Sequence, residues 1–188
     1  EKLISKKEAV LRIDPNSLDT LLHPTLDEKS SINVIANGLP ASPGAASGKV
    51  VFTSEEAERL TAMMQDTILV RVETSPEDIQ GMHAAKGILT ARGGMTSHAA
   101  VVARGMGRPC VSGSSEIDIN YENKTFRTQS MEIKEGEIIT IDGSTGRITL
   151  GSVSTVKPEI SGDFSKLMSW ADEFRKLNIR TNSETPKD

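Results

Sequence analysis

The chain has 188 residues, of which 36% are hydrophobic and 3% aromatic, and its net charge is −4. This length and composition predict one compact domain with extensions and an aliphatic core, and the acidic balance argues against nucleic acid and anionic membranes as partners. No apolar run approaches the roughly 20 residues of a membrane span. The single cysteine, Cys110, excludes an intrachain disulfide and a zinc site built from cysteines.

The N-terminal part of the sequence predicts a helical arm. Residues 3–11 place their apolar side chains at helical spacing, and Asp14-Pro15 ends that helix. A second helix is predicted from Pro15 to residue 23. Residues 25–36 are polar and aperiodic, which indicates a linker.

Strands and helices alternate through the middle of the sequence. In chain order we predict a loop at 38–48, a strand at 49–53, a helix capped by Ser54, a strand at 67–72, a helix beginning at 75–78, a strand at 87–90, a helix at 97–105, a strand at 109–112 and a hairpin at 137–150. The helix at 97–105 is apolar on every side, so we expect it to be largely enclosed. The alternation predicts an α/β fold whose sheet is partly parallel.

The C-terminal part predicts a second arm. Residues 153–161 indicate a linker, 164–177 a helix and 179–182 a short strand. The predicted domains are therefore an N-terminal helical linker arm at 1–36, a compact domain at 37–152 and a C-terminal linker at 153–188. Because the sequence begins with a residue other than Met, we expect a piece of a longer polypeptide.

The segment with the clearest chemical pattern joins a predicted strand to the helix at 97–105. Gly93-Gly94 allows a sharp turn without Cβ obstruction. Thr96 or Ser97 then caps the helix, and His98 falls in its first turn. A helix N-terminus favours an uncharged ring and an anion bound beside it, which suits a histidine that accepts and releases a phosphoryl group.

A purely structural interpretation stays open, in which this segment is a capping turn with an incidental histidine. A metal site is less well supported, because His23, His83 and His98 are far apart and lack a ligand spacing. Gly44 and Gly48 do not form a P-loop, since no Gly-Lys-Ser/Thr follows them.

Residues 93–107 read Gly-Gly-Met-Thr-Ser-His-Ala-Ala-Val-Val-Ala-Arg-Gly-Met-Gly, which resembles the phosphohistidine motif of the phosphoenolpyruvate-utilising enzymes. Other stretches that match this family are residues 18–24, 39–46, 73–78, 82–85, 142–146 and 170–172. The resemblance covers nearly the whole chain. It implies a compact, swivelling β/β/α phosphohistidine domain with helical linker arms at both ends.

The resemblance is closest to the branch of the family that makes phosphoenolpyruvate from pyruvate. It implies that ATP pyrophosphorylates His98, which then passes one phosphoryl group to phosphate and the other to pyruvate. The products are AMP, pyrophosphate and phosphoenolpyruvate, and the reaction is reversible. The resemblance places the Mg²⁺ cofactor on other domains of the complete enzyme, so we expect no metal ligand in this chain and no activity from the chain alone.

The resemblance also implies partners for the carrier. The domain would swivel on hinges at 25–36 and 153–161 between an N-terminal nucleotide-binding domain and a C-terminal (β/α)₈ barrel of the same polypeptide, with 162–188 leading to the barrel. The complete enzyme is expected to be a homodimer in the cytoplasm or, depending on the organism, in an organelle such as a plastid or glycosome. The oligomeric state of this piece stays open.

Six residues are expected to serve the reaction: the nucleophile His98, the supporting hydroxyl residues Thr96 and Ser97, and the phosphate-stabilising Gly93, Gly94 and Arg92. The resemblance further implies that a regulatory kinase and phosphatase act on Thr96, where a phosphate would add about −1.5 to −2 charge beside the ring. We expect Arg104 to complement the C-terminus of its helix and Cys110 to be a small core residue.

Two alternative functions stay open. Within the family, the chain could be the carrier domain of phosphoenolpyruvate synthase or of enzyme I of the sugar phosphotransferase system, which differ in the acceptor of the phosphoryl group. In a different class, it could be a swivelling docking module that is never phosphorylated.

Overall fold

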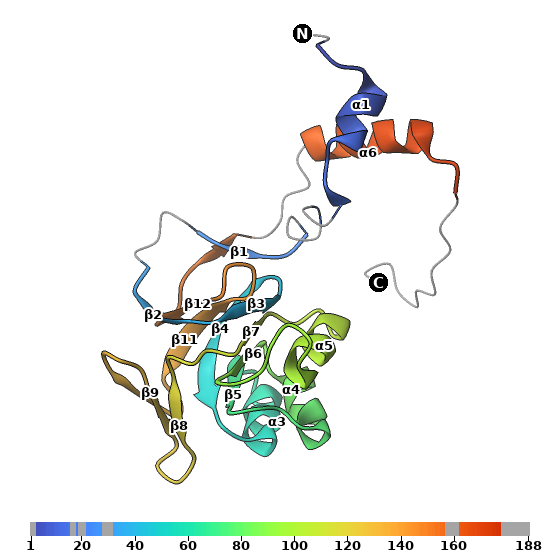
Figure 1. Ribbon diagram of the computed structural model, residues 1–188. Coiled ribbons are helices and arrows are strands. Elements are labelled where there is room, and N and C mark those ends of the chain that lie inside the picture. The colour runs from blue at the N-terminus through green and yellow to red at the C-terminus, as the bar shows by residue number, and fades with distance from the viewer. Residues whose placement is uncertain (1–2, 16–17, 19–21, 28–31, 157–161, 178–188) are drawn as a thin grey trace. The chain divides into compact units, whose positions relative to one another are not determined.

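The computed structural model describes residues 3–15, 18, 22–27, 32–156 and 162–177 (Figure 1). They fall into two compact units, one from the described parts of Glu1–Leu18 and Glu159–Asp188 and the other from those of Asp19–Pro158. Most of the helix predicted from Pro15 and the strand predicted at 179–182 lie outside the described residues. No helix of the described part is long and apolar enough to span a membrane.

The smaller unit contains two helices, α1 (Lys6–Leu11) and α6 (Gly162–Phe174), which pack on each other. The Ser5 side chain caps α1 by accepting a hydrogen bond from the Glu8 amide at 3.2 Å. Lys6 pairs with Glu173 at 2.8 Å and lies over the Trp170 ring. Both helices were predicted, although α6 ends at Phe174 rather than at residue 177.

The larger unit is built on an eight-stranded sheet with the strand order β2-β12-β11-β4-β5-β6-β7-β3. Its strands are β2 (Val34–Asn37), β3 (Leu39–Ser42), β4 (Ala45–Val51), β5 (Thr67–Arg71), β6 (Gly87–Thr90), β7 (Cys110–Ser112), β11 (Ile138–Asp142) and β12 (Arg147–Leu150). Strands β4 to β7 are parallel, and the remaining pairs are antiparallel. The predicted α/β class with a partly parallel sheet is confirmed.

Helices connect the parallel strands and cover one face of the sheet (Figure 1). They are α3 (Ser54–Ala62), the 3₁₀ turn η1 (Pro76–Asp78), α4 (Ile79–Ala84) and α5 (His98–Gly105). Because successive strand residues point to opposite faces, Leu69 packs among the helices, whereas Ile68 and Val70 contribute to a second core on the other face.

A three-stranded antiparallel sheet covers the second core. It consists of β8 (Asp118–Asn120), β9 (Thr125–Arg127) and β10 (Glu132–Lys134), and Figure 1 shows β8 and β9 across the parallel strands from the helices. Phe126 and Ile133 are buried against the larger sheet. This sheet was not predicted, because its short strands lie in a largely polar stretch.

The prediction of a loop throughout residues 38–48 was wrong, because β3 and β4 occupy most of it. Pro40 lies in β3, an edge strand of the sheet, where the missing N–H is tolerated. Gly48 lies where β4 passes close to β5: a Cβ there would be 2.8 Å from the Thr67 backbone nitrogen. Ser54 also differs from its prediction, since Thr53 caps α3 and Ser54 is buried as its first residue.

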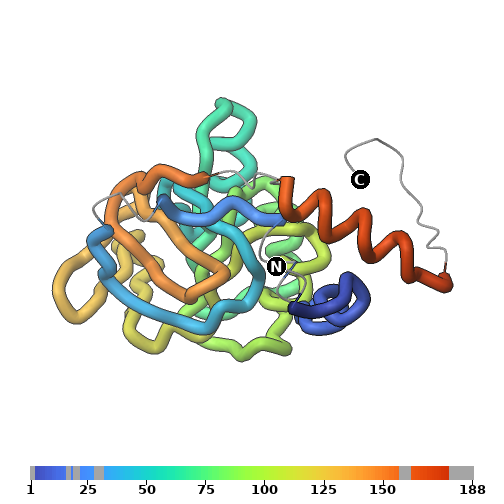
Figure 2. The backbone as a smooth tube through the Cα atoms, turned by 90° about the horizontal axis from the view of Figure 1, so that it is seen from above, coloured from blue at the N-terminus to red at the C-terminus, as the bar shows by residue number. Residues whose placement is uncertain are grey.

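The two predicted linkers contain strands that pair with each other. Strand β1 (Thr25–Leu26) is antiparallel to β13 (Thr155–Val156), and Leu26 joins Ala45 and Val153 in a small apolar cluster. Figure 2 shows the lighter blue segment that contains β1 and β2 alongside the orange strands β12 and β13, although they are far apart in the sequence. The hinge roles proposed for the two linkers stay predictions.

Candidate active site around His98

The residues singled out in the sequence gather where the parallel strands end. Strands β5 and β6 are adjacent, with Arg71 paired to Thr90 at their carboxyl ends. The loop after β6 carries Arg92 to Ser97, and the loop after β5 carries Glu73 and Thr74. Ligands commonly bind at this edge of an open α/β sheet, because the connecting loops and helix N-termini meet there.

Ser97 is the N-cap of α5. Its Oγ accepts a hydrogen bond from the Ala100 amide at 3.3 Å, and its backbone is extended. His98 is therefore the first residue of the helix and lies half-buried. The helix is not enclosed as predicted, because Val101 is 56% exposed and only one face packs on the sheet.

Gly93 is required by the turn that precedes α5. Its φ of +112° lies in a region that side chains disfavour, and a Cβ would be 2.9 Å from the Cβ of Ser97. Gly94 differs, because a Cβ there would meet nothing within 4 Å. In this close turn, the Ser97 Oγ lies 3.3 Å from the Ser112 Oγ. The Ser112 Oγ in turn lies 3.1 Å from the Thr90 Oγ1.

Thr74 is a contact that the sequence analysis missed. Its Oγ1 lies 3.0 Å from Nδ1 of His98 across 24 residues of sequence. This contact orients the imidazole and occupies one of its two nitrogens. The available signal was the position of Thr74 just after β5, but using it required knowing that β5 and β6 are neighbours.

A small pocket of about 200 Å³ opens beside the imidazole. It is lined by Glu73, Thr74, Arg92, Gly93, Ser97, His98 and Ala99. Arg92 is exposed, and its guanidinium takes part in none of the hydrogen bonds or ion pairs found among the described residues. Thr96 is exposed at the helix start and does not line the pocket. The pocket thus has both the imidazole of His98 and the available guanidinium of Arg92 in its lining.

Arg104 takes a role that was not predicted. Its guanidinium donates to the backbone oxygen of Ala41 at 2.7 Å and to that of Met95. The side chain therefore ties the loop before α5 to β3. Cys110 is fully buried, and burial raises the pKa of its thiol to about 12, which is consistent with the predicted core position.

No group of three or more metal-ligating side chains occurs among the described residues. The described residues around His98 do not form a cluster that fits Mg²⁺. The chemistry available here is that of an imidazole, hydroxyls, backbone amides and a guanidinium.

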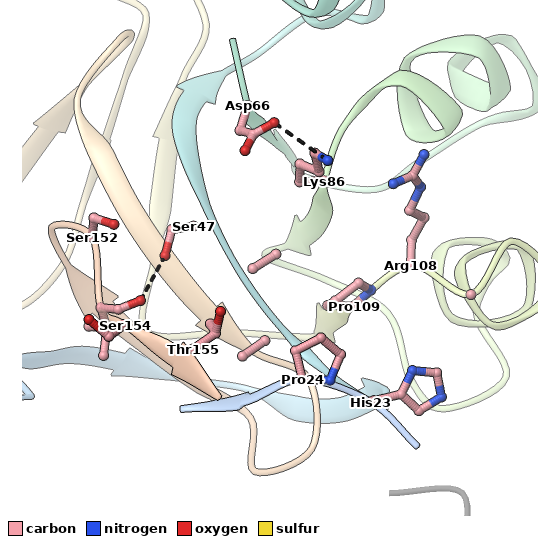
Figure 3. A pocket seen from close by; sticks show the side chains of 14 residues that line it. His23, Pro24, Ser47, Asp66, Lys86, Arg108, Pro109, Ser152, Ser154 and Thr155 are labelled. Atoms are coloured by element: carbon pink, nitrogen blue, oxygen red, sulfur yellow. Dashed lines mark hydrogen bonds and ion pairs between the residues drawn. The ribbon is translucent and has the colours of Figure 1, made fainter. Parts of the chain in front are cut away.

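A second pocket, of about 470 Å³, lies at the opposite edge of the parallel strands (Figure 3). Its charged side chains have partners: Lys86 lies 3.6 Å from Asp66, and Arg108 donates to the backbone oxygen of His83 at 2.8 Å. The pocket also contains His23, which is thus separated from His98 by the sheet's parallel strands.

Residues 63–146 match the family model of the PEP-utilising enzyme, mobile domain. The whole chain is 58% identical to a pyruvate, phosphate dikinase of Rhizobium meliloti, covering 21% of that protein. It is 56% identical over 190 residues to one of Clostridium symbiosum, covering 22%, and 52% identical to a chloroplastic one of Oryza sativa, covering 20%. These matches confirm the resemblance to the PEP-utilising enzymes that the motif around His98 predicted. The chain spans about a fifth of the length of these relatives.

Solved structures similar to the chain include the NMR solution structure of Enzyme I, with a TM-score of 0.34 and 22% identity over 60% of this chain and 40% of that one. The N-terminal domain of Enzyme 1 – Nitrogen has a TM-score of 0.31 and 24% identity over 55% of this chain and 37% of that one.

Proposed function

We propose that His98 is a phosphoryl carrier and that the chain is the carrier domain of an enzyme that converts ATP, phosphate and pyruvate into AMP, pyrophosphate and phosphoenolpyruvate. The observation that supports this most directly is the half-buried His98 at the start of α5, with Nδ1 on Thr74 and the available Arg92 in the same pocket. The identity to proteins named pyruvate, phosphate dikinase supports the choice of reaction.

The contact with Thr74 assigns different tasks to the two ring nitrogens. The proposed reaction requires the tautomer in which Nδ1 carries the proton and donates to Thr74 Oγ1, 3.0 Å away, so that Nε2 holds the lone pair. Nε2 then attacks the phosphorus atom, the bond from phosphorus to its leaving oxygen breaks, and the phosphorylated ring keeps its Nδ1–H bond to Thr74. Phosphate then takes the terminal phosphoryl group as the P–O–P bridge breaks. Attack by the enolate oxygen of pyruvate on the remaining phosphorus breaks the N–P bond and returns the lone pair to Nε2.

The surroundings of the ring favour the phosphorylated state. The N-terminus of α5 stabilises negative charge, and Arg92 can form two hydrogen bonds to phosphoryl oxygens. The amides of Gly93 and Gly94 donate to no backbone oxygen among the described residues, which leaves them available to an anion. Ser97 supports the site as the helix cap, and exposed Thr96 is accessible to a regulatory kinase and phosphatase.

The remaining components of the proposed enzyme belong to other parts of its polypeptide. They are the nucleotide-binding domain, the (β/α)₈ barrel, the Mg²⁺ sites and the contact that forms the homodimer. Segments 25–36 and 153–161 are the proposed hinges. The share of about a fifth that the chain covers in its relatives supports the presence of such additional parts in them.

The test is transfer of label from ATP carrying ³²P in the β position to the full-length protein. We expect a label that is stable in base and labile in acid, lost in His98→Ala and retained in the matched variant His83→Ala, whose histidine is exposed on α4. Label retained in His98→Ala would overturn the proposal. With ATP labelled in the γ position instead, release of the label as inorganic phosphate rather than as pyrophosphate would favour phosphoenolpyruvate synthase. Passage of a label from His98 to a carrier protein rather than to pyruvate would favour enzyme I.

A further inference from the structure

The segment that presents Thr74 to His98 has no regular structure of its own. It comprises residues 72–75, between the end of β5 and the start of η1. A hydroxyl that must stay 3.0 Å from Nδ1 therefore depends on whatever holds the two ends of this segment. Both ends are held by side chains that do not contact His98.

Tyr121 holds the first end. It lies in the turn between β8 and β9, and its hydroxyl accepts a hydrogen bond from the Val72 amide at 2.8 Å. Its ring meets that of Phe52 edge-on, with centroids 6.4 Å apart, and the Arg71 guanidinium lies 5.3 Å from its centroid. These two contacts restrain the ring and thereby the hydroxyl that binds Val72.

Asp78 holds the second end. Its side chain is nearly buried, with the residue 4% exposed, and its Oδ2 accepts from the Ser75 amide at 2.9 Å and the Ser75 hydroxyl at 3.3 Å. Its Oδ1 accepts from the Ser54 hydroxyl at 3.1 Å. Ser75 is the neighbour of Thr74, so the carboxylate controls where the Thr74 backbone lies.

Arg71 connects the two anchors. Its Nε lies 3.3 Å from Oδ1 of Asp78, but the N–H does not point along a hydrogen bond, so the contact is ionic. The guanidinium instead donates through Nη1 to the backbone oxygen of Phe52 at 2.9 Å. One arginine thus stands between the aromatic ring that holds Val72 and the carboxylate that holds Ser75.

We propose that Asp78 and Tyr121 are positioning residues for phosphoryl transfer, because together they hold Thr74 against Nδ1 of His98 and keep the lone pair on Nε2. The proposal rests on the proposed function of His98. If Asp78 only capped η1 and α4, replacing it would lower the free energy of unfolding and leave the His98 ring unchanged. In the positioning role, replacing it also changes which nitrogen of His98 carries the proton, although neither Asp78 nor Tyr121 touches that ring.

The first experiment uses potassium phosphoramidate on this chain, labelled with ¹⁵N in its histidine rings. Phosphoramidate phosphorylates a ring nitrogen directly: the new N–P bond forms as the P–N bond of the reagent breaks and ammonia leaves. We compare wild type with Asp78→Asn, Tyr121→Phe and the matched control Asp66→Asn, whose carboxylate lies at the opposite edge of the sheet. NMR reports the tautomer of His98 and the nitrogen that bears phosphorus.

In wild type we expect a single tautomer with Nδ1–H and phosphorylation at Nε2. Asp78→Asn should mix the two tautomers and slow phosphorylation at Nε2 roughly tenfold, since misplacement of about 1 Å can cost up to ~10²-fold. Tyr121→Phe should change the tautomer ratio of His98 and the phosphorylation rate at Nε2 in the same direction by a smaller factor. Asp66→Asn should match wild type. Thermal unfolding of each variant confirms that the rates are compared on folded chains.

The outcomes separate this proposal from the function of His98. The positioning proposal is overturned if folded Asp78→Asn and Tyr121→Phe show the same His98 ring signals and phosphorylation rates as wild type. This holds even where the full-length protein takes label on His98 from ATP. Absence of that label in the wild-type full-length protein overturns the proposed function instead. Where Asp78→Asn does not fold, Tyr121→Phe decides, because it removes one oxygen from a side chain that is 42% exposed.

Discussion

The two edges of the parallel strands β5, β6 and β7 carry different chemistry. At the carboxyl edge, Arg92 and Thr96 are exposed without a side-chain partner among the described residues, and His98 is half-buried beside a pocket of about 200 Å³. At the amino edge, Lys86 and Arg108 both have partners, although the pocket there is larger, at about 470 Å³. Groups left available, rather than cavity size, mark the candidate site.

The difference follows from how helices meet the strands at each edge. The carboxyl edge receives the N-terminus of α5, which favours an anion. The amino edge receives the end of α4, and Arg108 there donates to the His83 backbone oxygen near that helix end. A small site with an available cation suits the proposed carrier, whose phosphoryl donor would be held mainly by another domain.

Gly93→Ala should have the largest effect on this comparison. A side chain at φ +112° costs about 1–3 kcal/mol, and its Cβ would come within 2.9 Å of Ser97 Cβ, so the cap and His98 must move. We expect label transfer to His98 in the full-length protein to slow by roughly 10²-fold. Gly105→Ala, at the far end of α5, is the matched control, since its Cβ meets nothing within 4 Å. Equal rates in the two variants would contradict the role given to Gly93.

Ser97→Ala should have a smaller effect and separates the site from helix stability in general. Loss of the cap lowers the free energy of unfolding by about 1 kcal/mol, measured by urea denaturation. Thr53→Ala removes the equivalent cap of α3, with the same expected loss of stability. Only Ser97→Ala should also slow phosphorylation of His98, because only that cap precedes the ring. A comparable slowing in Thr53→Ala would show that stability alone sets the rate.

Local patterns in the sequence predicted the start of the candidate site well. Strand β6 has the predicted bounds, and α5 begins at the predicted cap, because glycines, a capping hydroxyl and a run of small apolar residues act over a few residues. The matches to the PEP-utilising enzyme family confirm the resemblance drawn from the same segment. The roles assigned to His98, Thr96 and Arg92 stay predictions.

Contacts between distant segments could not be predicted in the same way. Thr74 reaches His98 only because β5 and β6 are neighbours in the sheet, and Tyr121 reaches Val72 only through the unpredicted three-stranded sheet. Residues 38–48 resembled a loop because glycine and proline usually mark turns. Here Pro40 is tolerated in an edge strand, and Gly48 allows β4 to lie close to its neighbour β5. The order in which strands pair decides which of these residues meet, and a single sequence does not specify that order.

Lys86→Ala should have the smallest effect and tests the amino edge directly. Its ion pair with Asp66 is exposed and 3.6 Å long, so the free energy of unfolding should change by less than about 1 kcal/mol. Label transfer to His98 should stay within about twofold of wild type. Arg92→Ala, at the carboxyl edge, should slow the same transfer by roughly tenfold or more, because a hydrogen bond to a charged group contributes about 1.5–3 kcal/mol. An equal loss in both variants would mean that the two edges do not differ in function.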